Sequence, residues 1–372
     1  VAWDGSQFFV AWQDSRDAVY DDIYGARVSA AGEVLDVAGI AVSTATNGQW
    51  HPSVTSDGSQ FFVVWQDFRS ESGSDIYGAR VSAAGVVLDA DGIAVSAAAS
   101  GAYYPSAAWD GSQFFVVWTD VRSESSSDIY GARVTAAGTV LDSEGIAVST
   151  AAGSQDYPSV AWDGSQFFVA WQDSRNGSSN YDIYGARVTA AGAVLDAEGI
   201  AVSNATSNQL YPSVASNGGQ FFVVWQDNRN GSSNYDIYGA RVSAAGAVLD
   251  AEGIEVSMAE NFQQYPSVAS DGSQFFVAWQ DYRSGSTNDI YGTRVSAAGA
   301  VLDTEGIAVS TAARNQLYPS VVWDGSRFFV AWQDSRNTSS DIYGTRVSTS
   351  GEVLAAEGIV VTIAANTQAS PS

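Results

Sequence analysis

Short apolar runs alternate with polar turns along the whole chain. The run from Phe8 to Trp12 is apolar at consecutive positions, as expected of a strand that is buried on both faces. Asp4-Gly5, just before it, favours a tight hairpin turn, because both central positions of such a turn have positive φ. No segment has a sustained apolar period of 3.6 residues. The pattern therefore predicts an all-β protein.

The same pattern recurs seven times. The copies span residues 1–53, 54–106, 107–159, 160–213, 214–267, 268–320 and 321–372. Each contains an inner strand that opens at Pro-Ser-Val, the aromatic strand, a strand such as Ile23 to Val28 and an outer strand such as Gly39 to Ser43. A strand pattern with this period is typical of propeller blades. We therefore expect one domain, a seven-bladed β-propeller with four antiparallel strands per blade; a β-solenoid is the alternative.

One motif joins the second strand to the third. Trp-Gln-Asp-x-Arg precedes a polar loop and Asp-Ile-Tyr, as in Asp173, Arg175 and Asp182 to Tyr184. With the Asp-Gly turn and the aromatic strand, this motif resembles the TolB-type, WD-like propeller repeats of many bacterial secreted and periplasmic proteins. The resemblance covers all seven copies and implies the propeller fold, which binding proteins, scaffolds and some enzymes share.

The two ends of the sequence complement each other. The chain starts inside an inner-strand motif, and it ends with Ser370, Pro371 and Ser372, which precede that motif in the other copies. We therefore expect the C-terminal segment to complete the first blade and close the ring. The absence of an initial Met also favours a processed chain or a domain of a longer one.

Charge narrows the range of partners. The chain has 41 acidic residues against 16 basic ones, all of them Arg, for a net charge of -25. Such a surface repels nucleic acid and anionic lipid, and no apolar run approaches the roughly 20 residues that span a bilayer. With no Cys, thiolate metal sites and disulfides are excluded. We expect a secreted or cell-surface, monomeric domain that binds neither nucleic acid nor membranes.

Two Asp residues flank each loop between the second and third strands, with an Arg two positions after the first. One interpretation is a brace in which the Arg bridges both carboxylates. The other is a Ca²⁺ site, because the loops are rich in oxygen ligands, although the Arg opposes a cation. No other cofactor is expected. The candidate metal ligands are Asp14 and Asp22, Asp67 and Asp75, Asp120 and Asp128, Asp173 and Asp182, Asp227 and Asp236, Asp281 and Asp289, and Asp334 and Asp341.

An aromatic residue precedes Pro-Ser in six copies. We expect these side chains to surround the mouth of the central channel, either covering the seams between blades or forming a stacking platform for a glycan or a protein ligand. Acidic loops favour neutral glycans over anionic ones. The candidate ligand-binding residues are Trp50, His51, Tyr104, Tyr157, Tyr211, Tyr265 and Tyr318, with Ala369 in the last copy.

A single active site should appear as a departure from the repeat. His51 is the only His in the chain, and no nucleophile, zinc or phosphate-binding motif accompanies it. We therefore expect no catalytic residues and a non-enzymatic binding or scaffold module. The alternatives are a polysaccharide lyase or hydrolase, in which His51 and a nearby Tyr or Arg act as acid and base, and an amplified or designed repeat without an evolved ligand.

Overall fold

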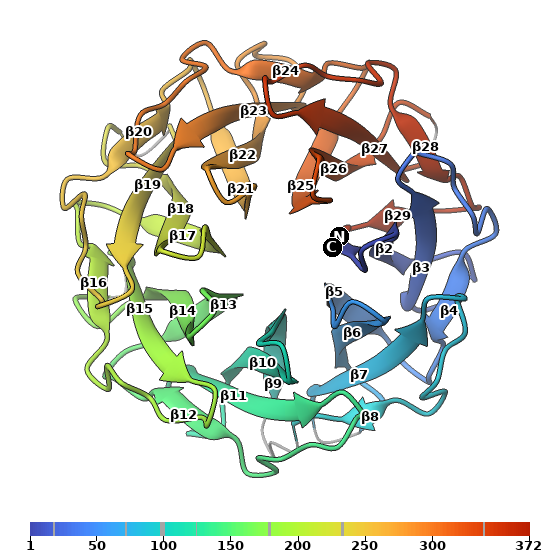
Figure 1. The fold of residues 1–372 in the computed structure, drawn as a ribbon, viewed down its shortest axis with the longest axis horizontal. Coiled ribbons are helices and arrows are strands. Elements are labelled where there is room, and N and C mark those ends of the chain that lie inside the picture. Colours follow the sequence, from blue (N-terminus) through green and yellow to red (C-terminus); the bar gives the residue numbers. More distant parts are fainter. Residues whose placement is uncertain are drawn as a thin grey trace.

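Seven antiparallel sheets are arranged in a ring around a central opening (Figure 1). The computed structural model describes residues 1–17, 19–70, 73–96, 101–123, 125–177, 180–231, 234–337 and 339–372. Each blade has four strands that follow one another from the centre to the rim, and the first sheet gains a fifth strand from the C-terminus. The expected seven-bladed β-propeller is confirmed. Within the described ranges, no helix has the length and apolar character needed to cross a membrane.

The strands have nearly the same bounds in every blade. The innermost strands are β1 (Ala2–Trp3), β5 (Gln49–Ser56), β9 (Ala102–Trp109), β13 (Gln155–Trp162), β17 (Gln209–Ser216), β21 (Gln263–Ser270) and β25 (Gln316–Trp323). The second strands are β2 (Gln7–Asp14), β6 (Gln60–Asp67), β10 (Gln113–Asp120), β14 (Gln166–Asp173), β18 (Gln220–Asp227), β22 (Gln274–Asp281) and β26 (Arg327–Asp334).

The third strands are β3 (Asp22–Ser29), β7 (Asp75–Ser82), β11 (Asp128–Thr135), β15 (Asp182–Thr189), β19 (Asp236–Ser243), β23 (Asp289–Ser296) and β27 (Asp341–Ser348). The outer strands are β4 (Ile40–Ser43), β8 (Ile93–Ala94), β12 (Ile146–Ser149), β16 (Ile200–Ser203), β20 (Ile254–Ser257), β24 (Ile307–Ser310) and β28 (Ile359–Thr362). The last strand, β29 (Gln368–Ala369), belongs to the first blade.

The hydrophobic core lies between blades. Phe8 packs on Phe329 of the last blade with ring centroids 4.6 Å apart, and Phe9 packs on Phe61 of the next blade at 5.0 Å. The two faces of β2 therefore contact different neighbours, which is why its sequence is apolar at consecutive positions. The Phe9 ring also covers Gly25 so closely that a Cβ at that position would collide with it.

The C-terminus closes the ring, as the ends of the sequence predict. β29 pairs with β2, with Gln13 opposite Ala369. Ala11 and Ser372 then exchange two backbone hydrogen bonds of 2.8 Å. Figure 1 places the two ends of the chain together at the inner edge of the first blade, beside the central opening.

The inner strands start earlier than expected. The sequence predicts a start at Pro-Ser-Val, but β5 begins at Gln49, and its register with β6 shifts between Trp50 and Ser53. His51, within the shift, has a φ of 52°. This bulge lets pairing continue past Pro52, which has no backbone N–H for a ladder.

Candidate functional site

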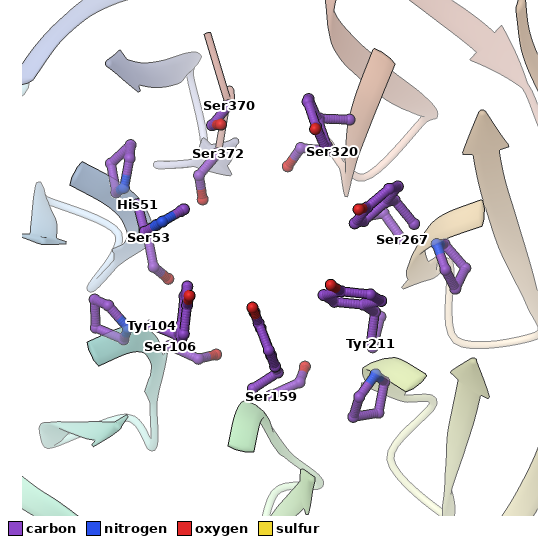
Figure 2. A pocket seen from close by; sticks show the side chains of 18 of the residues that line it. His51, Ser53, Tyr104, Ser106, Ser159, Tyr211, Ser267, Ser320, Ser370 and Ser372 are labelled. Carbon is purple, nitrogen blue, oxygen red and sulfur yellow. The ribbon is translucent and has the colours of Figure 1, made fainter. Parts of the chain in front are cut away.

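A central cavity of about 450 Å³ opens where the seven inner strands meet. Six of the inner strands and the C-terminal segment each contribute three consecutive residues, and Figure 2 shows side chains of this lining around a common space. The lining consists of His51 to Ser53, Tyr104 to Ser106, Tyr157 to Ser159, Tyr211 to Ser213, Tyr265 to Ser267, Tyr318 to Ser320 and Ser370 to Ser372.

Hydrogen bonds between blades hold the lining in place. The backbone N–H of His51, in the left-handed region, donates to the Oε1 of Gln13 in the preceding blade at 3.0 Å. The N–H of Tyr211 likewise donates to Gln172. The Ser of five Pro-Ser pairs accepts from the next blade, as Ser159 Oγ does from the N–H of Val214 at 3.2 Å. The lining is therefore part of the rigid frame.

Six aromatic rings form a continuous arc around the cavity. The ring centroids lie 4.8 Å apart for His51 and Tyr104, 4.1 Å for Tyr104 and Tyr157, and 4.7 Å for Tyr157 and Tyr211. The arc continues with centroid distances of 4.7 Å between Tyr211 and Tyr265 and 4.9 Å between Tyr265 and Tyr318. The rings thus cover the seams between blades and line the cavity at the same time.

The seventh position of the arc is Ser370, not Ala369 as the sequence interpretation had it. Ser370 directly precedes Pro371, and its φ of 50° matches the 52° of His51. Ser370 also belongs to the lining of the central cavity (Figure 2). The arc therefore has a gap beside His51, between the last blade and the first.

Burial favours the neutral forms of several side chains that line the cavity. Burial lowers the pKa of His51, so its imidazole is neutral. Burial, followed by the neighbouring Tyr211, raises the pKa of Tyr265 to about 12. Tyr157 has a raised pKa for the same reason, with Tyr104 and Tyr211 beside it. All lining residues are described, and none is Asp or Glu. His51 contributes the one imidazole of the lining, and in its neutral form this group can accept a proton.

Trp50 lies apart from the other predicted ligand-binding residues. It does not line the central cavity but a second hollow of about 370 Å³, together with Val19, Tyr20 and Asp21. Trp50, Tyr20 and Val19 are 38%, 54% and 74% exposed. Val19 and Tyr20 belong to the loop between β2 and β3, which the sequence did not lead us to predict as a binding site. A signal was present, because the other copies have Ser, Gly, Thr or Asn at these two positions.

The Asp-x-Arg motif forms a closed local network. Both oxygens of the fully buried Asp14 are occupied: Oδ1 accepts from the N–H and Nε of Arg16, both at 2.9 Å, and Oδ2 accepts from Trp12 Nε1 at 2.8 Å and Arg16 Nη2 at 2.6 Å. The guanidinium of Arg16 also lies 3.7 Å above the ring of Tyr24. The expected bridge to both carboxylates is wrong, because the guanidinium turns back to the first Asp; among the described residues, no ion pair joins it to Asp22.

In three blades the second Asp of the motif accepts a hydrogen bond from an Asn of the same loop. Asn176 donates to Asp182 at 2.7 Å, and Asn337 donates to Asp341 at 2.7 Å. Burial, followed by repulsion from Asp17 and Asp14, raises the pKa of Asp22 to about 6. Among the described residues, no three His, Cys, Asp or Glu side chains gather as a metal cluster would require. Calcium at these loops stays a prediction.

The fold is similar to that of solved propeller structures. A periplasmic gluconolactonase from Pseudomonas aeruginosa matches with a TM-score of 0.58 and 13% identity, over 97% of this chain and 98% of that one. An α-L-arabinanase from Penicillium chrysogenum, complexed with arabinobiose, matches with a TM-score of 0.52 and 12% identity, over 82% and 94%. An α-L-arabinofuranosidase from Lactobacillus brevis has a TM-score of 0.43 and 12% identity, over 67% and 92%.

These likenesses show the propeller fold. No protein-family model matches the chain, and no curated protein matches its sequence, so the resemblance to TolB-type repeats stands at the level of the fold. The expectation of a non-enzymatic binding or scaffold module is corrected by the comparison, because the gluconolactonase and the arabinanase, each with a TM-score above 0.5, are named as enzymes.

Proposed function

We propose that this chain is a carbohydrate-acting propeller enzyme that binds a neutral sugar in the central cavity and uses His51 as its general base. The observation that carries the proposal is the coincidence of three features at one place: the single His of the chain, the cavity lining and the gap in the aromatic arc. A unique catalytic group in a repeat protein must break the repeat, and His51 does so inside the cavity.

The aromatic arc suits a sugar ring. The half-buried Tyr rings offer apolar faces for the C–H groups of a sugar, and the Ser hydroxyls of the lining offer hydrogen bonds for its O–H groups. The net charge of -25 disfavours uronic or sulfated substrates, which also argues against a lyase, since that reaction needs a uronate.

Hydrolysis fits the groups that are present. The neutral imidazole of His51 accepts a proton from water as the water oxygen attacks the substrate carbon; the C–O bond breaks, and the imidazolium returns the proton to the leaving oxygen. Glycosidases generally need two carboxylic side chains, and the lining has no Asp or Glu. A sugar lactone or sugar ester therefore fits better than a glycoside, and the gluconolactonase with the same fold supports this choice.

The hollow at Trp50 offers room for more of the substrate. Trp50 precedes His51 in the same strand, and its exposed ring forms a side of the second hollow with Tyr20. A substrate held at His51 can extend toward it on the outer surface. The periplasmic location named for the gluconolactonase is consistent with action outside the cytoplasm.

The test is hydrolysis of a panel of neutral sugar lactones, acetylated sugars and oligosaccharides. His51→Tyr restores the residue that five other copies carry, so it should fold normally and lose at least about 100-fold in kcat/KM. Tyr211→Ala combined with Tyr265→Ala should weaken binding of neutral sugars by calorimetry. Unchanged turnover in His51→Tyr, or no turnover of the whole panel by the parent protein, would overturn the proposal.

A further inference from the structure

A repeated ion pair has lost its carboxylate in one blade. In six blades the third-strand Arg holds an Asp of the following turn, as Arg27 holds Asp36 in the first blade. The other pairs are Arg80 with Asp89, Arg133 with Asp142, Arg187 with Asp196, Arg241 with Asp250 and Arg294 with Asp303. In the seventh blade the Arg is Arg346, and Ala355 stands at the Asp position.

Three donors of the Arg define the shape of the missing group. In the sixth blade, Asp303 accepts from the backbone N–H of Arg294 at 3.0 Å, from its Nε at 2.9 Å and from its Nη2 at 2.7 Å. These donors converge on the two oxygens of one planar carboxylate. Guanidinium groups favour such bidentate contacts with carboxylates.

Arg346 keeps the geometry of these donors. Arg346 lies opposite Phe329 of the neighbouring strand, just as Arg294 lies opposite Phe276 in the sixth blade. Its Nη1 donates to the carbonyl of Ala30 in the next blade at 3.1 Å, as the Nη1 of Arg294 does to Thr349. Its Nε, however, is buried and has no hydrogen-bond partner among the described residues. A buried donor without a partner is costly, so the site favours any anion that satisfies it.

A second substitution adds positive charge beside the first. Arg327 takes the position of a Gln that, in the other blades, bonds a carbonyl of the next blade, as Gln274 does to Thr349. Arg327 is diagonal to Arg346 on the same face of β26 and β27. The carboxylate Oδ2 of Asp324 lies 3.9 Å from the Nε of Arg327. Replacing Gln by Arg and Asp by Ala each shifts the local charge by one positive unit, in a chain that is otherwise strongly acidic.

We propose that Arg346, with its backbone N–H and the adjacent Arg327, binds a small carboxylate ligand between the last blade and the first. The six Asp side chains at this position are 16–19% exposed, so the site is accessible from solvent. Since Ala355 keeps its Cβ, the ligand carboxylate must approach from the solvent side, and formate is the smallest probe. This site lies outside the central cavity and does not depend on the function proposed above.

The test compares formate with chloride at equal ionic strength. Formate should raise the melting temperature of the parent protein saturably and shift the Arg346 Nε resonance in ¹⁵N spectra. Ala355→Asp restores the carboxylate of the other blades, so it should raise the melting temperature and abolish both responses. Asp303→Ala recreates the same donors in the sixth blade, beside Gln274, and should be destabilised in chloride and partly rescued by formate.

Two results would overturn the proposal. One is an equal response of the parent protein and Ala355→Asp to formate, which would mark a general solvent effect. The other is an Arg346 resonance that does not move with formate. Because Ala355→Asp only restores the sequence of the other repeats, a folding failure is not expected to obscure the comparison.

Discussion

Asp14, at the end of the second strand of the first blade, pairs in register with Gln368 near the C-terminus. Gln368 is fully buried, and Ser15 donates to the carbonyl of Thr367 at 2.9 Å beside it. Hydrogen bonds between the two ends of the chain thus close the ring.

Removal of residues 368–372 should therefore destabilise the whole propeller. The deletion removes the pairing of β29 with β2 and the two bonds between Ala11 and Ser372. At about 1 kcal/mol for each lost bond, we expect a loss of about 4 kcal/mol in unfolding free energy. Urea denaturation measures it, with Ser372→Ala as the control that keeps the backbone. A truncated chain as stable as the control would contradict this closure.

The fold could be predicted because each copy of the sequence carries the same signals. Three local patterns each correspond to a feature of the ring: the Asp-Gly turns, the strand from Phe8 to Trp12 that is apolar on both faces, and the inner-strand motif that is divided between the two ends of the chain. The bulge at His51 could not be predicted, because its positive φ depends on a hydrogen bond to Gln13 in another blade.

The buried Asp network makes a second prediction. Asp173→Asn keeps the size of the side chain but removes the charge that Arg175 and Trp171 bind. Breaking a buried ion pair should cost about 3 kcal/mol, seen as a lower urea midpoint. Asp182→Asn, at the other end of the loop, should cost less than about 1 kcal/mol, because Asn176 is its main partner. Equal costs would contradict the assignment of the network to the first Asp.

The partner of each Arg could not be read from the sequence. An Arg between two acids is compatible with a bridge to both, and only the geometry shows that the guanidinium of Arg16 turns back to Asp14 above the ring of Tyr24. The pairing of Arg27 with Asp36 was predictable because the two lie on either side of one turn. The location of His51 in the cavity followed from its place in the repeat, whereas its chemistry did not, since a single His without a motif has no sequence signature.

The calcium prediction can be tested directly. The oxygens of each first Asp already accept N–H donors, so we expect EDTA to leave the melting temperature unchanged. A rise in melting temperature with added CaCl₂ would contradict this expectation. In that case Asp182→Asn should reduce the rise, because Asp182 is the carboxylate left for a cation in one of the seven loops.

Two Asp residues should respond to pH with opposite signs. The pKa of Asp22 is raised from 3.8 to about 6, so its stabilising contribution is present below pH 3.8 and is lost as the pH rises to about 6. Asp22→Asn should therefore stabilise the protein by about 1 kcal/mol at pH 7, since partial solvent access screens the repulsion, and should have no effect below pH 4.

The hydrogen bond from Arg80 lowers the pKa of Asp89, so Asp89→Asn should destabilise the protein at pH 7 and lose this effect in acid. Urea midpoints across pH measure both; the same sign for both variants would contradict the assignment.

Ser370→Tyr should complete the aromatic arc. Ser370 has the same left-handed backbone as the six aromatic positions, so a Tyr can take their conformation and fill the gap between Tyr318 and His51. Two new ring contacts should raise the unfolding free energy by about 1–2 kcal/mol, measured by urea denaturation. If the gap admits the substrate to His51, the same variant should raise KM for the sugar substrate while His51 keeps its pKa in an NMR titration. Ser370→Ala is the control, since it removes the hydroxyl without filling the gap. A variant that is stabilised but has unchanged KM would show that the gap is not the entry to the cavity.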